Sequence, residues 1–370
     1  MFAAFAGEPV SADQIRRRLP KDTPSGVAAI LAATLNSDPA SHNTDWFGTL
    51  LMKGLLEWGR RYVPEAGPFA RTWLEAHLNR DTVSPYSGHR SRPARAGGVP
   101  ITTYAGQFGL CFPCYEIYTQ SKDERARRVC IELADIILHE VARNRFGLVA
   151  HDDTAEFAIP DTCYFAVSAL ILASALDRTG GAVYRRQAVF QLRTYTDTFL
   201  MPDTGLAKTI LLKDGLGKTY WTRATGWLLW SITSVLGHLP PEDPAFAGFV
   251  RDARKLADGI SRVQDESGGL RLFLNEPDSP LETTGTAMCA MGLHEAIRRR
   301  WLPASYTPVV ERAWKYVTGN ITPEGDIRRA YTGWAVPAEN HEVELDQRKM
   351  GWIPGFILST AYELTAAGRT

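Results

Sequence analysis

The chain has 370 residues and equal numbers of basic and acidic side chains, 41 Lys plus Arg against 41 Asp plus Glu. This balance creates no net field that would attract nucleic acid or a membrane surface, so neither is expected as a partner. The composition, 45% hydrophobic and 22% charged, is that of an ordinary soluble protein. No apolar run reaches the roughly 18 residues that a membrane span requires.

Helical spacing of apolar residues recurs along the whole chain, whereas the alternation typical of strands is scarce. Ser121 and Glu124 are read as a capping box that opens one helix. Asp161 precedes the apolar run 165–176 and is placed at a helix N-terminus, where the helix dipole favours a carboxylate. The predicted helices cover residues 24–36, 46–62, 66–79, 105–119, 123–143, 163–178, 182–199, 224–237, 243–262, 284–299, 305–319 and 349–366.

Short turns join these helices into six pairs, and longer loops rich in Gly and Pro separate the pairs. A hairpin recurring about every 55–60 residues indicates a closed helical toroid, an all-α (α/α)6 barrel. Its long loops would gather at one end and form a cleft there, since function usually resides on loops held by a rigid scaffold. We expect one domain over residues 1–370, with residues 1–20 as a peripheral segment.

The N-terminal residues lack the basic and long apolar stretches of a signal peptide. Five cysteines, an odd number without disulfide-framework spacing, fit a reducing compartment. We therefore expect a cytoplasmic protein. Cys111 and Cys114 form a lone C-x-x-C. Without a second pair of ligands it favours two buried thiols over a zinc site.

The loop 144–161 is the first candidate for chemistry, because it holds His151, Asp152, Asp153, Glu156 and Asp161. Carboxyl groups crowded together or against apolar walls have raised pKa values, which suit a general acid near neutral pH. The alternatives are turn capping for Asp152 and Asp153 and a plain helix N-cap for Asp161.

A second candidate is the stretch 220–227, in which Trp221 and Trp227 bracket Arg223. The guanidinium can bind a carboxylate with two hydrogen bonds, and the rings can stack on a sugar. Alternatively, the tryptophans pack in the core and Arg223 pairs with an acid of the protein. A third candidate is Glu282, which opens another apolar helix as a functional acid or as a cap. A fourth is His341, which lies in a charged segment that is typical of a solvated loop.

Signatures of other chemistries are absent from the sequence. It contains no phosphate-binding glycine loop, no zinc-binding H-E-x-x-H and no serine-nucleophile elbow. The eight histidines are scattered without metal-ligand spacing. We therefore expect neither a metal nor a cofactor.

At these loops the sequence resembles the unsaturated uronyl hydrolases of the glycoside hydrolase 88/105 type, from Trp46 to about Leu364. The most specific match is Trp221-Thr-Arg223-Ala-Thr-Gly226-Trp227, which is similar to the family's W-x-R-x-x-G-W signature. The remaining matches are Asp45-Trp46 with the glycine helix that follows, Pro160-Asp161-Thr162-Cys-Tyr-Phe, Glu282-Thr-Thr-Gly-Thr-Ala-Met and Pro323-Glu-Gly-Asp326-Ile.

The resemblance implies an (α/α)6 barrel that acts on the 4,5-unsaturated uronic acid at the non-reducing end of lyase-generated oligosaccharides. In this family an aspartate, here Asp161, protonates the vinyl ether and helps to add water. One acid/base residue suffices, unlike the two carboxylates of ordinary glycosidases. Arg223 would hold the uronate carboxylate or nearby hydroxyls. The other expected contacts to substrate are Trp46, Tyr104, Asp153, Lys208, Trp221, Trp227, Glu282 and His341.

Two departures from the family pattern keep other functions open. No acid accompanies Tyr104, where the family usually has a second aspartate, and Lys208 or Thr209 replaces a common histidine. A β-glucuronidase-like hydrolase would need a second carboxylate, such as Asp153 or Glu282. A polysaccharide lyase would favour a base such as Tyr104 or His151, and a non-catalytic glycan-binding ring would need neither. The sequence determines neither the source polysaccharide nor the oligomeric state.

Overall fold

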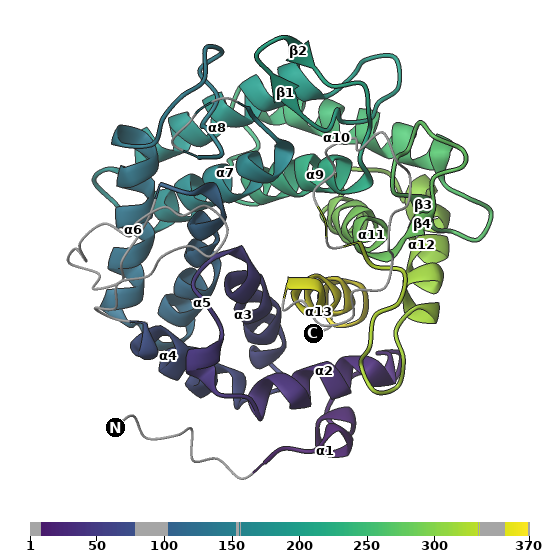
Figure 1. Ribbon diagram of the computed structural model, residues 1–370. Helices are drawn as coiled ribbons and strands as arrows, with labels where there is room; N and C mark the ends of the chain where they lie inside the picture. The colour runs from purple at the N-terminus through teal and green to yellow at the C-terminus, as the bar shows by residue number, and fades with distance from the viewer. Residues whose placement is uncertain are drawn as a thin grey trace.

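The computed structural model describes residues 9–77, 103–152, 155, 157–331, 333 and 352–368. It is an (α/α)6 barrel in which an outer ring of helices surrounds an inner ring (Figure 1). The inner ring consists of α3 (Trp46–Gly59), α5 (Cys111–Ser121), α7 (Pro160–Leu176), α9 (Thr222–Leu236), α11 (Thr283–Arg298) and α13 (Trp352–Thr365). The outer ring consists of α2 (Ser25–Leu35), α4 (Ala66–Ala76), α6 (Glu124–His139), α8 (Gly181–Phe199), α10 (Phe246–Val263) and α12 (Thr307–Gly319).

Each predicted helix has a counterpart in the barrel, so the predicted fold is confirmed. Two two-stranded antiparallel ladders lie in the loops before α9 and α11. They are β1 (Leu211–Leu212) with β2 (Gly215–Leu216), and β3 (Leu270–Arg271) with β4 (Leu281–Glu282). Short 3₁₀ turns are η1 (Pro39–Ser41), η2 (Ala105–Leu110) and η3 (Ala304–Tyr306).

The helices of the inner and outer rings differ in how much of their surface is buried. On α7, Pro160 and residues 162–173 are all buried, as expected for a helix with neighbours on every side. Helix α10 instead buries a single stripe, which includes Phe249, Leu256 and Ile260, and exposes its other face. An outer helix such as α10 needs only one apolar stripe to pack on the inner ring. An inner helix such as α7 is therefore recognisable in the sequence by apolar residues on all its sides.

The inner ring closes where α13 packs against α3, and glycines permit that contact. A Cβ on Gly54 would lie 2.7 Å from the Cβ of Leu358, and one on Gly355 would lie 2.6 Å from the carbonyl carbon of Leu50. Both distances are shorter than side-chain atoms tolerate, so any larger residue would push the two helices apart.

Aromatic rings fill the middle of the inner ring. Trp227 lies 5.1 Å from Tyr164, 5.6 Å from Trp230 and 5.3 Å from Phe356, measured between ring centroids. Tilted and edge-on arrangements at these distances are the favourable ones for aromatic pairs. This aromatic layer divides the barrel into two ends, one where the inner helices begin and one where they finish.

The structure corrects two details at helix ends. The capping box assigned to Ser121 and Glu124 is wrong, because Ser121 ends α5 and Asp123 caps α6 by accepting from the backbone N–H of Arg125. Helix α7 begins at Pro160, so Asp161 lies inside its first turn instead of before it. Proline suits this position because its missing N–H has no partner in a first turn.

The N-terminal segment extends the barrel with a short helix that packs on the outer ring. Helix α1 (Ala12–Arg16) lies outside the rings and packs on α2, where Ile15 and Leu19 are buried (Figure 1). Cys111 and Cys114 are free, buried thiols, as their pattern predicted. Among the described helices none is both long and apolar enough to cross a membrane.

Candidate active site

The candidate residues gather where the inner helices begin. Trp46 starts α3, Asp161 and Arg223 lie in the first turns of α7 and α9, and Glu282 caps α11. Tyr104 precedes η2, which leads into α5. The positive ends of the helix dipoles converge at this end of the barrel. Such a place favours an anionic ligand, since the first N–H groups of each helix have no partner within the helix.

Asp161 lies at this end as a half-buried carboxyl. Its buried oxygen Oδ1 accepts no hydrogen bond within the described part of the chain. Burial raises the pKa of Asp161 to about 6, against the opposing effects of the Arg223 charge and of the Trp227 indole. A carboxyl that keeps its proton close to neutral pH is suited to general acid catalysis.

Trp227 and Asp161 lie close together without completing a hydrogen bond. The indole of Trp227 acts on the carboxyl and lowers its pKa, yet the nitrogen Nε1 has no acceptor in normal geometry. Trp221 and Trp352 likewise have buried Nε1 donors that lack an acceptor among the described residues. Three buried N–H donors are thus available around this end of the barrel, and each would gain from an incoming oxygen atom.

Arg223 is buried and held on both faces. Its guanidinium carbon lies 4.1 Å from the ring centroid of Trp221 and 4.7 Å from that of Trp352. It donates to the carbonyl groups of Tyr331 and Gly333, the latter at 2.9 Å. Burial lowers the pKa of Arg223 to about 10, opposed by Glu282 and Asp161, so the side chain remains charged at neutral pH.

These contacts change what is expected of Arg223. The N–H groups that serve the two carbonyls fix Tyr331 and Gly333 to the inner ring, and they are not free for a substrate. The positive charge still acts on the carboxyl of Asp161. The predicted interaction of Arg223 with acids of the protein is present as charge interactions with Glu282 and Asp161, whereas its contact to a substrate stays a prediction.

Glu282 is fully buried and serves as the cap of α11. Its Oε1 accepts from the backbone N–H and hydroxyl of Thr284, at 2.8 and 2.6 Å, and from the backbone N–H of Tyr331 at 3.1 Å. Its Oε2 accepts from the backbone N–H of Gly285 at 2.6 Å. Four hydrogen bonds within the protein use the lone pairs of this carboxylate, which favours capping over chemistry.

Tyr104 and His151 form one wall beside α7. Their ring centroids lie 5.2 Å apart in an edge-on arrangement, and Nδ1 of His151 is 2.8 Å from the hydroxyl of Thr162, the neighbour of Asp161. Gly106 permits the close packing of this wall, because a Cβ there would lie 2.9 Å from the Trp46 ring. The structure thus brings Tyr104, Trp46 and Asp161 to the same end.

Lys208 is placed differently from the other candidates. Its Nζ donates to the carbonyl of Lys218 at 2.8 Å and lies 3.9 Å from the ring centroid of Tyr220. These contacts tie the lysine to its own loop. Asp153 and His341 lie outside the described residues.

Trp352 was not among the predicted site residues. Its ring is buried, lies 5.1 Å from the Trp46 ring and covers one face of Arg223. The available signal was its position at the start of the last inner helix, equivalent to that of Trp46 at the start of the first. The charged residues that precede it indicate a solvated loop, so Trp352 reads as ordinary core in the sequence.

The chain is similar in sequence to known proteins. Residues 100–366 match the family model for Glycosyl Hydrolase Family 88. The chain is 26% identical over 239 residues to the unsaturated rhamnogalacturonyl hydrolase YesR of Bacillus subtilis (strain 168), covering 62% of this chain and 67% of that protein.

Two solved structures are similar in fold. A possible member of the GH105 family from Salmonella enterica superposes with a TM-score of 0.76 at 17% identity, covering 98% of this chain and 99% of that one. An unsaturated glucuronyl hydrolase from Bacillus sp. GL1 gives 0.67 at 15% identity, covering 97% and 100%.

The closed double ring of helices, together with the match to the family model, defines a helical-barrel glycoside hydrolase. The chain belongs to glycoside hydrolase family 88.

Proposed function

We propose that this protein hydrolyses oligosaccharides that carry a 4,5-unsaturated uronic acid at the non-reducing end, with Asp161 as the acid/base. The carboxyl of Asp161 gives its proton to C4 of the vinyl ether while water adds to C5 and returns a proton to the carboxylate. The resulting hemiketal opens to a 5-keto group and a hemiacetal at C1, which releases the aglycone. One water is consumed, and Asp161 ends in its starting state.

The observation that carries this proposal is the raised pKa of the Asp161 carboxyl together with its buried oxygen, which has no partner in the described part of the chain. The pKa of about 6 leaves the carboxyl about half protonated at pH 6 and about one tenth protonated at pH 7. A single residue that both gives and takes a proton needs a pKa close to the working pH.

The surroundings of Asp161 support an acidic sugar as the substrate. The converging helix N-termini and the charge of Arg223 favour an anion. Trp221, Trp227 and Trp352 supply buried N–H donors, and Trp46 supplies a half-buried ring for stacking. The named relative YesR, an unsaturated rhamnogalacturonyl hydrolase, makes rhamnogalacturonan-derived disaccharides the first substrates to test.

An ordinary glycosidase on the same scaffold would need a second working carboxylate. Glu282 is one of the two acids considered for that role, and its carboxylate oxygens already accept four hydrogen bonds within the protein. This favours the hydration reaction, which needs one acid/base.

The test is to follow the ultraviolet absorbance of the conjugated uronate while the protein acts on lyase-generated disaccharides in D₂O. Hydration predicts loss of absorbance, release of one aglycone per double bond, and one deuterium at C4 of the product at early times. The isolated product, incubated in D₂O alone, controls for later exchange beside the ketone. Cleavage that leaves the double bond intact, or cleavage of a saturated glucuronide at a similar rate, would overturn the proposal.

A further inference from the structure

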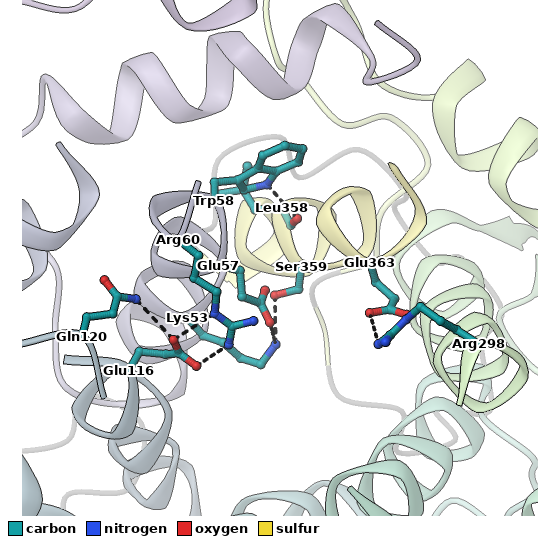
Figure 2. Close-up of polar contacts among 10 residues, drawn as sticks. All are labelled: Lys53, Glu57, Trp58, Arg60, Glu116, Gln120, Arg298, Leu358, Ser359 and Glu363. Carbon is teal, nitrogen blue, oxygen red and sulfur yellow. Dashed lines mark hydrogen bonds and ion pairs between the residues drawn. The ribbon is translucent and has the colours of Figure 1, made fainter. Parts of the chain in front are cut away.

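A cavity of about 390 Å³ lies at the opposite end of the barrel, where the inner helices finish. All six inner helices contribute to its lining, which includes Trp230 of α9. Figure 2 shows Lys53 of α3 and Glu363 of α13, which also line it. Asp161 and Arg223 do not line it. Tyr164 and Trp230 of the aromatic layer line the cavity, whereas Trp227 does not. The size of the cavity is within the range of about 300–1,000 Å³ that is usual for small-molecule sites.

Two ion pairs on neighbouring inner helices line one side of this far-end cavity. Lys53 contacts Glu57 at 2.7 Å and also donates to the hydroxyl of Ser359 at 3.2 Å. Arg298 of α11 binds Glu363 of α13 through Nε at 2.7 Å and a second nitrogen at 3.0 Å (Figure 2). The side chains of Lys53 and Glu57 are each only 12% exposed, so solvent screens this pair weakly.

Two further pairs complete the charged lining. Arg60 binds Glu116 with two hydrogen bonds, one of them from Nε at 3.0 Å (Figure 2). Arg299 contacts Glu295 at 3.1 Å. Each of the four Lys and Arg side chains of the lining is thus paired with one of its four Glu side chains.

The far-end cavity offers hydrogen-bonding groups and aromatic surface together. The buried oxygen Oε2 of Glu57 has no hydrogen-bond partner in the described part of the chain. Arg298 uses two of its three nitrogens on Glu363. Tyr164 lies in the lining between Phe112, whose ring is stacked on it at 5.0 Å, and Trp230 at 5.5 Å.

These features restrict the chemistry of a ligand. A hydroxyl group both donates and accepts, so it can join an arginine to a carboxylate without adding charge. A charged ligand would place an unbalanced charge beside the weakly solvated Lys53 and Glu57, which is costly. We propose that the far-end cavity is a second binding site, for a neutral mono- or disaccharide, distinct from the end that holds Asp161. This inference does not depend on the proposed function.

The experiment is isothermal titration of the full chain with a panel of neutral sugars: L-rhamnose, D-galactose, maltose and cellobiose. Glucosamine and glucuronate serve as charged counterparts of similar size. We expect saturable binding of at least one neutral sugar, with a Kd of the order of 1 mM or tighter, and at least tenfold weaker binding of the charged pair. No binding of any neutral sugar, or equal binding of the charged ones, overturns the proposal.

A pair of variants locates the binding. Met291 lines the cavity and is partly exposed, so Met291→Trp fills space there, while Met291→Leu nearly keeps the volume. The Trp variant is expected to bind at least tenfold more weakly and the Leu variant like the parent, with turnover of both within twofold of the parent. Unchanged binding to Met291→Trp would place the sugar elsewhere and overturn the proposal.

A second change keeps the test decisive if Met291→Trp does not fold. The double substitution Lys53→Met with Glu57→Gln removes one ion pair as a unit and preserves the net charge. Weaker sugar binding by at least tenfold in this folded variant supports the site, and parental affinity contradicts it.

Discussion

Replacing Asp161 with Asn separates the chemical role of this residue from its effect on stability. Asn has nearly the same shape but cannot deliver a proton. We expect turnover to fall at least about 10²-fold, the lower end of the usual contribution of a general acid/base. At the same time the variant should be more stable than the parent at pH 7, because the buried carboxyl of the parent must then ionise.

The size of the stability effect follows from the pKa. Burial raises the pKa of Asp161 from 3.8 to about 6. At about 1.36 kcal/mol per pH unit, ionising the native residue costs about 3 kcal/mol. Because the folded pKa is the higher one, this cost is absent below pH 4, grows between pH 4 and 6, and is complete above pH 6. With an unfolding entropy of about 2.1 cal/mol/K per residue, it corresponds to a Tm gain of about 4 °C.

The assay is a thermal unfolding series at pH 4 and pH 7 for the parent and Asp161→Asn, combined with turnover on an unsaturated disaccharide. Turnover of the parent should decline above about pH 6, as Asp161 loses its proton. Asp177, at the other end of α7, provides a matched control. Slight burial opposes the effect, but hydrogen bonds from Thr179 hold the pKa of Asp177 below its usual range. Asp177→Asn should therefore lower Tm at pH 7 and leave turnover unchanged.

Two results would refute this reasoning. Near-normal turnover of Asp161→Asn would remove the residue from the chemistry. An equal Tm gain at pH 4 and pH 7 would show that ionisation is not the source of the stabilisation.

Substitutions at three positions test the neighbouring side chains. Arg223→Met removes a charge that lowers the pKa of Asp161, so the alkaline limit of turnover should move to higher pH. Arg223→Lys should restore the pH profile but not Tm, and an unmoved profile in Arg223→Met contradicts the coupling. Glu282→Gln should lower the free energy of unfolding by about 2 kcal/mol, since the amide NH₂ of the new side chain faces hydrogen-bond donors. Its kcat per folded molecule, measured by active-site titration, should stay within about threefold of the parent. A loss of kcat of about 10²-fold would instead make Glu282 a catalytic acid. Lys208→Ala should change KM less than threefold, because Lys208 is held by Lys218 and Tyr220; a tenfold rise in KM on the acidic disaccharide would show that it reaches the substrate.

The sequence by itself determined the elements of the barrel. Apolar residues at helical spacing, interrupted by Gly and Pro, identify each helix of both rings, because helix formation and one-sided burial are local requirements. The same local logic identified Asp161 and Arg223, since polar residues that open an apolar helix stand out from their neighbours. It failed at Ser121, where two local solutions competed and Asp123 capped the helix instead.

Tertiary structure alone decided what the polar side chains do. Arg223 is held by Tyr331 and Gly333, more than a hundred residues later in the chain, and Glu282 accepts from Tyr331 as well as capping its own helix. The pKa of Asp161 depends on burial and on charges from other helices. No local pattern encodes such contacts, because they exist only once the ring closes.

The far-end cavity also shows which features follow from local sequence and which depend on tertiary structure. The charged residues that line it read in the sequence as ordinary polar positions near the ends of apolar helices, which solvent would normally cover. Closure of the ring brings Lys53, Arg298 and Glu363 from helices distant in sequence to one cavity (Figure 2). Helix positions follow from local periodicity, whereas the environment of each charge depends on how the helices are packed together.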